Sequence, residues 1–302
     1  MKKPELSIVI VSFNTAELLQ KCLSSLNAVR DEVSFEVIVV DNASEDGSVD
    51  MVRKMFPNVK LILSKKNLGF AGGNNLVRKY VKGDNVLFLN SDTTVPRGTL
   101  KNSLEKLHSD KYIGALTCKI VLPNGEMDKD TRRSFITPWN GLVHLFLKLD
   151  RVFPKSKLFA SYWYGYIPEN ATHEVDVIQG AFFLTYKKVL DETGWFDEDY
   201  FLDGEDIDLC WKIKESGRKI IYYPEAKIIH FKGASKGKAT NVRKKDIPLK
   251  NRLKYRLAGV NSMEIFYRKR LWNKYPLILN YCVLMGIRVI KSIRLLRTLF
   301  LG

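Results

Sequence analysis

Hydrophobic residues in the first third of the chain occur in short, uninterrupted runs separated by amphipathic segments. The runs are SIVIV at 7–11, FEVIVV at 35–40, VKLIL at 59–63 and NVLFL at 85–89. None alternates apolar with polar residues, which predicts strands buried on both faces. The helices expected between them span 16–26, 48–56 and 74–81. Strands alternating with helices predict a parallel sheet built from βαβ units.

The second half is less regular but continues the same theme. The further expected strands are VDVIQG at 175–180, AFFLTY at 181–186, KIIYY at 219–223 and AKIIHF at 226–231, and a helix is expected at 205–216. The predicted fold class is α/β, with a mostly parallel central sheet flanked by helices. We expect a catalytic domain over residues 1–238 and a helical tail over residues 239–302.

The charge of the chain is concentrated in that tail. Of the formal net charge of +16, +13 lies in residues 239–302, which contain 15 Lys and Arg but only Asp246 and Glu264. The four cysteines are far apart and form no CxxC pair, which argues against a disulfide framework or a zinc site and fits a reducing, cytoplasmic setting. The basic, apolar start MKKPELSIVIVSF is interpreted as the first strand and not as a signal peptide.

Polar side chains that could carry chemistry follow the predicted strands. Asp41, Asp92 and His230 stand at or just after the ends of apolar runs, and the pair Glu205-Asp206 opens a predicted helix. Ligands of open α/β sheets bind outside the carboxyl ends of the strands. Each residue also has an ordinary explanation, as a turn residue, a helix cap or a structural histidine. Together they favour an active site along one sheet edge.

Two further segments bear on ligand binding. Asn67–Asn75 (NLGFAGGNN) is a glycine-rich bend opening a helix, where backbone N–H groups suit a phosphate or carbonyl. It is not GxGxxG and follows the third strand, and the segment 233–238 lacks P-loop spacing, which together argue against a dinucleotide fold and a nucleoside triphosphatase. In Asn90-Ser91-Asp92, two oxygen ligands stand two residues apart, as suits Mg²⁺ or Mn²⁺ held together with substrate phosphates.

These motifs, taken in order, resemble a known enzyme family. They are SIVIVSFN (7–14), VVDNAS (39–44), NLGFAGGNN (67–75), LNSD (89–92), QGAFFL (179–184), GWFDEDYFLDGEDIDLCWK (194–212) and IIHFKGAS (228–235). The succession is similar to inverting glycosyltransferases of family 2, with the GT-A fold, and most like the rhamnosyltransferase-type enzymes that build bacterial surface polysaccharides. The resemblance covers about residues 5–238.

The resemblance implies a UDP- or dTDP-sugar donor and a set of residues that bind it. Asp41 would contact the pyrimidine ring, with Ser12 and Asn14 lining the pocket beside it. The full donor set implied is Ser12, Asn14, Asp41, Asn67, Gly72, Asn75, Asn90, Ser91 and Asp92.

The resemblance also implies metal-assisted transfer. Asn90 and Asp92 match the family's DxD motif, with Asn in the first position, and Asp92 and His230 would hold Mn²⁺ or Mg²⁺. Trp195, Asp197 and Glu205 would shape the acceptor side, and Asp206 would be the base that deprotonates a hydroxyl of a glycan or polyprenyl-linked acceptor. Direct attack by that hydroxyl inverts the anomeric configuration without a covalent enzyme intermediate.

The pattern of the tail predicts an amphipathic helix within 275–301. Arg288, Lys291, Arg294 and Arg297 recur every third residue, with Ile and Leu between them. The segment lacks the uninterrupted apolar length of a spanning helix, about 20 residues, and fits a helix lying on an anionic membrane, which predicts a peripheral location on the inner face of the cell membrane. The alternative is a helix packed on the catalytic domain or on a second subunit of a homo-oligomer. The aromatic and basic insert at 139–166 would either meet a lipid-linked acceptor or act as a covering loop.

Two other function classes remain open at this point. A basic nucleic-acid-binding protein would spread its positive charge over the folded domain and would not cluster acids at strand ends, where they repel phosphates. The acids argue against nucleic acid as a partner. A non-catalytic nucleotide-sugar or glycan-binding module would keep the pocket but not turn over its ligand.

Overall fold

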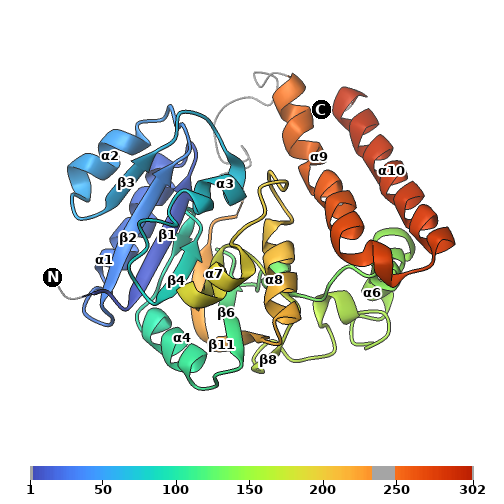
Figure 1. The fold of residues 1–302 in the computed structure, drawn as a ribbon, viewed down its shortest axis with the longest axis horizontal. Helices are drawn as coiled ribbons and strands as arrows, with labels where there is room; N and C mark the ends of the chain where they lie inside the picture. The colour runs from blue at the N-terminus through green and yellow to red at the C-terminus, as the bar shows by residue number, and fades with distance from the viewer. Residues whose placement is uncertain (1–2, 233–248, 301–302) are drawn as a thin grey trace.

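The computed structural model describes residues 3–232 and 249–300 as a twisted sheet covered on both faces by helices, with a helical hairpin beside it (Figure 1). The parallel strands predicted from the first four apolar runs are confirmed: β1 (Leu6–Ser12), β2 (Phe35–Asp41), β3 (Lys60–Leu63) and β4 (Asn85–Leu89). β1 lies between β2 and β4, and β3 pairs with β2. The ends of β1 and β2 are in register, with Ser12 opposite Asp41.

The sheet continues with strands from the second half of the chain. Its order is β3-β2-β1-β4-β10-β6-β11-β5 among the described residues. The new members are β5 (Thr93–Thr94), β6 (Ile113–Val121), β10 (Phe182–Tyr186) and β11 (Lys219–His230). β10 runs antiparallel to both its neighbours, β4 and β6, whereas β6 and β11 are parallel. The sheet is therefore mixed but mostly parallel, as predicted.

Three expected elements differ in the structure. The helix expected at 74–81 is α3 (Gly69–Asn75), which starts within the glycine-rich bend and is followed by turns. The two strands expected at 219–231 form the single strand β11, with a register shift between Tyr223 and Lys227 where Pro224 interrupts the ladder. Of the strand expected at 175–180, only β9 (Val177–Ile178) is extended.

The two faces of the sheet are covered by different helices. The helices are α1 (Ala16–Asn27), α2 (Ser48–Met55) and α4 (Thr99–His108) on one face, and α3, α7 (Lys187–Thr193) and α8 (Glu205–Glu215) on the other. Both faces of β1 are buried, which explains why its sequence does not alternate apolar with polar residues. Ile8 and Ile10 join the core beneath α1 while Val9 joins the opposite core, and all three are fully buried.

Between β6 and β10 the chain forms an insert of short elements. These are β7 (Arg132–Arg133), α5 (Pro138–Gly141), the π-helical turn η2 (Leu142–Leu147), α6 (Leu149–Val152), η3 (Ser161–Trp163) and β8 (His173–Glu174). Of these, β8 returns to the main sheet by pairing antiparallel with β11. β7 pairs with β9 in a separate two-stranded sheet, so the start of the insert is joined to the segment that leads into β10.

The tail forms an antiparallel pair of helices, α9 (Leu249–Phe266) and α10 (Leu277–Phe300), joined by the turns η5 (Tyr267–Leu271) and η6 (Trp272–Lys274) (Figure 1). Val260, Phe266 and Leu284 of this hairpin share a buried cluster with Tyr200 and Trp211 of the main body. The tail therefore packs on the sheet body of its own chain, one of the arrangements that the sequence left open. The expected boundary at 238/239 lies outside the described residues.

Ion pairs reinforce this packing. Arg270 of the tail donates from Nε to Asp208 Oδ1 at 2.7 Å and from Nη2 to Oδ2 at 3.0 Å, and Asp208 is fully buried in α8. Lys269 donates to both Asp197 and Asp199, with each distance 2.6 Å. Much of the basic character of this segment is thus matched by acidic residues of the main body.

We expect Arg270→Ala to lower the free energy of unfolding by about 3 kcal/mol, because removing one partner of a buried ion pair strands the other charge. Asp208 would retain a hydrogen bond from Tyr200 and a more distant Lys212 among the described residues. Urea denaturation measures the change. Arg268→Ala is the matched control: among the described residues Arg268 forms an ion pair with Glu264 one helical turn away and lies over the Trp272 ring, and it is half exposed, so the change should cost less than about 1 kcal/mol. Equal losses in both variants would contradict the anchoring role of Arg270.

Candidate functional site

A cleft of about 960 Å³ lies at the carboxyl ends of the central strands. Its walls come from the ends of β1 and β4, the insert, the first turn of α8 and one face of α9. Of the predicted site residues it is lined by Asn67, Asn90, Ser91, Asp92, Glu205, Asp206 and His230. The structure therefore brings together residues that are up to 163 positions apart in the sequence, Asn67 and His230 being the outermost.

At the β1 and β2 ends, the expected pocket residues lie directly behind the cleft wall. Asp41 accepts a hydrogen bond from the backbone N–H of Ser44 through Oδ2, while its buried Oδ1 accepts none from the residues that the structure describes. Ser12 contacts Thr15 through its hydroxyl. Asn14 adopts a left-handed conformation, with φ of 52°, and its Oδ1 accepts a hydrogen bond from the backbone N–H of Glu45. Val11 and Phe13 supply the surface that faces the cleft here.

The glycine-rich bend is held by an amide network. Asn42, which sequence reasoning did not single out, donates from Nδ2 to Asn67 Oδ1 and to the carbonyl of Gly69, and accepts the N–H of Leu68. Gly69 has φ of +74°, and a Cβ there would lie 2.1 Å from the carbonyl oxygen of Phe201. The bend needs glycine at this position because the loop before α8 packs directly on it.

Gly72 and Asn75 are placed differently from the rest of the expected donor set. Gly72 is buried within α3, against Leu68. Asn75 donates to the carbonyl of Phe196 and to Glu198 Oε1 and accepts the N–H of Phe196. Neither residue is among those lining the cleft. Asn75 instead stabilises the loop that leads into α8 through its hydrogen bonds to Phe196 and Glu198.

The centre of the cleft holds a buried histidine between two carboxylates. His230, at the end of β11, lies with Nε2 3.1 Å from Asp92 Oδ1 and with Nδ1 3.4 Å from Asp128 Oδ2. Asp128 is itself buried and is also approached by Lys232 and Gln179. Burial alone would lower the pKa of His230, but hydrogen bonding and charge from Asp128 and Asp92 raise it to about 9.

Asp92 and His230 have the chemistry of a site for a hard divalent cation. Both oxygens of Asp92 are buried: Oδ1 lies against His230 Nε2 at 3.1 Å, whereas Oδ2 accepts no hydrogen bond from the residues in 3–232 and 249–300. Asp128, on the far nitrogen of the imidazole, is placed as outer-shell carboxylates are in metal sites. Within those ranges no group of three or more His, Cys, Asp or Glu side chains could hold a metal. A cation held by Asp92 and His230 would leave further positions to substrate phosphates and water, as is usual for Mg²⁺.

The opposite wall is the first turn of α8. Gly204, at the position before the helix, has φ of +145°, and a Cβ there would lie 2.7 Å from Ser262 Cβ of α9. Asp206 is buried, and Arg133 Nη2 donates to its Oδ2 at 3.2 Å. Burial raises the pKa of Asp206, and the charge of Arg133 opposes that rise only in part. Glu205 lies beside Asp206, also buried and also on the cleft.

Trp195 and Asp197, expected on the acceptor side, do not line the cleft. Trp195 is fully buried in the core, where its indole N–H donates to Asp191 and its ring meets the edge of Phe88. Asp197 pairs with Lys269 of the tail. Both residues support the loop before α8.

Sequence reasoning missed Arg133 and Asp128. Both come from the insert, where Asp128 ends the turn segment PNGEMD and Arg133 is the second of two arginines in a stretch without clear periodicity. Nothing in the local pattern relates either residue to Asp206 or His230, which lie 73 and 102 positions further along the chain. Only the fold of the insert brings them to the cleft.

Comparison with known proteins places the chain in a family. The model of "Glycosyl transferase family 2" matches residues 7–194, well over half of the chain. The chain therefore belongs to this family. A similar relative is the N-acetylglucosaminyl-diphospho-decaprenol L-rhamnosyltransferase of Mycobacterium tuberculosis, 26% identical over 246 residues, covering 77% of this chain and 78% of that protein. The rhamnosyltransferase WbbL of Escherichia coli is 25% identical over 74% of this chain and 82% of its own length.

Solved structures agree on the fold. The mannosyltransferase PcManGT of Pyrobaculum calidifontis, solved with GDP-Man and Mn²⁺, superposes with a TM-score of 0.53 at 19% identity, covering 99% of this chain and 88% of that one. Residues 1–349 of TarS from S. aureus superpose with a TM-score of 0.51 at 18% identity, over 88% of this chain and 73% of that one. The predicted GT-A architecture is confirmed.

We expect the pKa of His230 in metal-free protein to be about 9, and we expect Asp128→Asn to lower it, because one of the two carboxylates that stabilise the imidazolium is removed. Since the pKa in the folded state exceeds the ordinary 6.5, this contribution to stability is full below the ordinary value and is lost as the pH rises through about 9. Histidine NMR titration in EDTA measures the pKa. An unchanged His230 titration in Asp128→Asn would contradict the pairing.

Proposed function

We propose that this member of glycosyl transferase family 2 transfers rhamnose or another hexose from a nucleoside-diphosphate sugar to a hydroxyl of a glycan or lipid-linked acceptor. The reaction would be an inverting displacement within cell-surface polysaccharide synthesis. Family membership and the two rhamnosyltransferase relatives support the reaction class and the process.

One observation carries the proposal. The cleft has, on one wall, the buried carboxylate of Asp92 beside His230, with its Oδ2 unpaired among the described residues, and, on the other, the buried carboxylate of Asp206 with a raised pKa. Asp92 and His230 suit a cation that neutralises a leaving diphosphate, and Asp206 suits a general base. Sugar transfer from a nucleoside diphosphate needs both at opposite sides of one anomeric carbon.

The donor would lie along the strand ends from Asp41 to Asp92. The unsatisfied Oδ1 of Asp41 supports its role toward a pyrimidine, whose ring N–H is a hydrogen-bond donor. Asn67, at the turn before α3, faces the cleft beside it. Ser12, Asn14, Gly72 and Asn75 would then act by shaping the backbone of this pocket.

Asp92 and His230 would hold a divalent cation, with Asp128 fixing the imidazole. When bound, the cation neutralises negative charge on the leaving diphosphate. Asn90 leaves this motif with one carboxylate, so the site depends more heavily on His230, and protonation of that imidazole would compete with the cation.

Asp206 would take the proton of the acceptor hydroxyl as the oxygen attacks. Its buried position keeps water away and raises its pKa, which makes it a stronger base than an exposed aspartate. Arg133 Nη2 donates to Asp206 Oδ2 at 3.2 Å, and this contact fixes the orientation of the carboxylate. The displacement needs no covalent intermediate.

The nucleic-acid alternative is weakened by the way the basic residues are used. Arg268, Lys269 and Arg270 each pair with acidic side chains of the chain itself. A non-catalytic binding module would bind the donor without turning it over. The buried carboxylate of Asp206, which suits a general base, favours an enzyme.

A peripheral location on an anionic membrane is supported by α10. Among the described residues, no helix has the length and apolar character needed to cross a bilayer. α10 buries Leu284 and Ile287 toward its neighbours, yet Ile278, Met285 and Phe300 are 82%, 63% and 78% exposed. Apolar side chains exposed among arginines and lysines are typical of helices in the membrane interface. Assembly through the tail remains a prediction.

The proposed function is tested with a panel of dTDP-rhamnose, UDP-glucose, UDP-galactose and UDP-N-acetylglucosamine. We expect one of them to raise the melting temperature in the presence of Mn²⁺, because a ligand that binds only the folded state stabilises it. The shift should shrink in EDTA and in Asp92→Ala, which removes the carboxylate that would hold the cation. If no donor shifts the melting temperature, or if the shift is unchanged by EDTA and by Asp92→Ala, a metal-dependent donor site is contradicted.

We expect Asp206→Asn to keep donor stabilisation but to lose transfer by about 10²- to 10⁴-fold, because the amide preserves volume and cannot accept the proton. In the native enzyme kcat/KM should rise with pH through the Asp206 pKa, since the charged form is the base. Asp199→Asn, at an exposed partner of Lys269, is the control and should be close to native. Near-native transfer in Asp206→Asn would overturn the assignment.

For the membrane surface we expect the triple variant Arg288→Glu, Lys291→Glu, Arg297→Glu to lose sedimentation with vesicles containing anionic lipid. Each basic residue near such a surface contributes about 1 kcal/mol, and the changes reverse three. Neutral vesicles and high salt should weaken native binding similarly. Unchanged melting shows that the hairpin is intact, and unchanged sedimentation would mean that α10 does not meet the membrane.

A further inference from the structure

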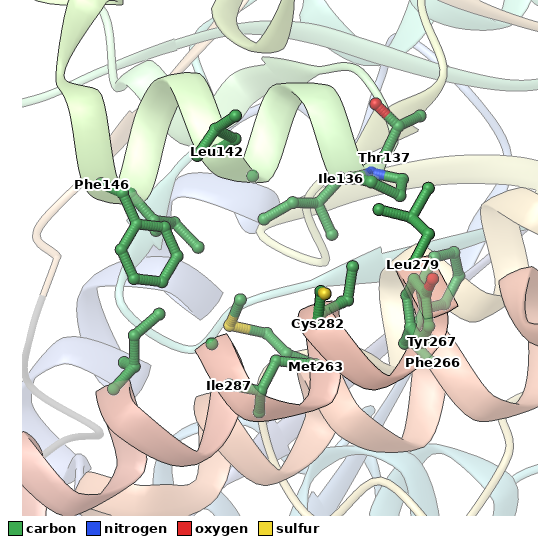
Figure 2. A pocket seen from close by; sticks show the side chains of 16 residues that line it. Ile136, Thr137, Leu142, Phe146, Met263, Phe266, Tyr267, Leu279, Cys282 and Ile287 are labelled. Carbon is green, nitrogen blue, oxygen red and sulfur yellow. The ribbon is translucent and has the colours of Figure 1, made fainter. Parts of the chain in front are cut away.

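A second hollow lies between the insert and the C-terminal hairpin (Figure 2). It has a volume of about 250 Å³, and its walls come from α5 and η2 on one side and from α9, η5 and α10 on the other. In Figure 2, Leu142 and Phe146 project from the insert toward Met263, Cys282 and Ile287 of the hairpin. We call this hollow the apolar groove.

The groove offers almost nothing to a polar ligand. Its hydroxyl groups belong to Thr137 and Tyr267, and each already has a partner: Thr137 accepts the N–H of Asn140, and Tyr267 donates to Asn280. The rest of the lining side chains are hydrocarbon, the thioether of Met263 and the thiol of Cys282. Binding strength would come from apolar area removed from water, so the fitting ligand is a hydrocarbon chain.

The groove is continuous with the candidate active-site cleft. Ile136, Leu145, Met263 and Phe266 line both hollows. Along α10, Ile290 lines the groove and Arg294, one turn further, lines the cleft. A ligand lying along α10 would therefore pass from an apolar channel to a cation and then to the wall that holds Asp206.

The other end of the groove is open. Leu142, Phe146 and Leu279 line it and are 44%, 47% and 37% exposed, and Tyr281 and Met285 continue the exposed apolar surface of α10. The volume is below the roughly 300–1,000 Å³ of pockets that enclose a whole small ligand. The groove thus suits one segment of a longer chain that continues outward.

We propose that the apolar groove binds the first isoprenoid units of a polyprenyl diphosphate-linked acceptor. The diphosphate would lie at Arg294, and the sugar hydroxyl would face Asp206. This order of hydrocarbon, anion and sugar matches the order of groove, arginine and carboxylate. The inference rests on the proposed function, since it supplies the acceptor site for that transfer.

Cys282 provides a reporter for occupancy. It lines the groove and is exposed, whereas Cys22, Cys118 and Cys210 are buried. We expect geranylgeranyl diphosphate, at a concentration well above its Kd, to slow alkylation of Cys282 by N-ethylmaleimide by about tenfold or more, because only protein with an empty groove reacts. Intact mass follows the reaction. Inorganic pyrophosphate should not protect.

The matched control moves the thiol off the groove. In Cys282→Ser combined with Ser292→Cys, the reporter is on the same helix but at an exposed position that does not line the groove. Protection there equal to that at Cys282 would mean that the lipid merely coats α10, and the proposal would be wrong. Absence of protection at Cys282 would also overturn the proposal. The same holds if Cys282 is labelled slowly in the absence of lipid and quickly after the protein is diluted, because a second copy of the chain would then cover the groove.

A filling variant tests the same site without the thiol. A Cβ at Gly286 would lie 3.2 Å from Phe146 Cζ, so Gly286→Leu occupies the groove. We expect this variant to bind geranylgeranyl diphosphate about tenfold or more weakly by calorimetry, with Ser292→Leu close to native. Donor stabilisation should persist in both. Native lipid affinity in a folded Gly286→Leu variant overturns the groove, whereas loss of donor stabilisation in the native protein would overturn the proposed function instead.

Discussion

The burial of acidic side chains at the start of α8 is the constraint on which the rest of the structure depends. Asp206 and Asp208 both leave water, and each needs a cation because an unpaired buried carboxylate is costly. The insert supplies Arg133 to the first and the tail supplies Arg270 to the second. Two segments outside the sheet are thereby tied to one helical turn, and the cleft between them acquires its walls.

A second buried charge cluster fixes the opposite wall. His230 lies between Asp92 and Asp128, and its position at the end of β11, paired with Thr93 of β5, joins the strand end to the turn that carries Asp92. In both clusters the proposed functional residue, His230 or Asp206, belongs to the strands and helices of the sheet body, whereas a residue that orients it, Asp128 or Arg133, comes from the insert. The insert therefore acts on both halves of the proposed chemistry.

The same insert explains why the molecule has two adjoining hollows of different character. Its polar beginning, around Arg133, faces the cleft, and its apolar continuation through Leu142 and Phe146 faces the hairpin. The hairpin is anchored by Arg270 and by the cluster around Trp211, which leaves one side of α10 to the insert and another exposed. A tail that appears in the sequence as a basic appendage becomes a wall of both hollows.

The sequence by itself determined the sheet body and its strand-end residues. Continuous apolar runs specify doubly buried strands, and Asp41, Asp92 and His230 follow from where those runs end; the ordered motifs also indicated the family. The positions of β10 in the sheet, the docking of α9, and the partners Arg133 and Asp128 were decided only by tertiary structure. Residues such as Trp195 and Asp197 share the motif but point into the core and toward Lys269. Local pattern reports periodicity and strand ends, whereas the pairing of buried charges depends on contacts between segments far apart in the chain, which periodicity does not encode.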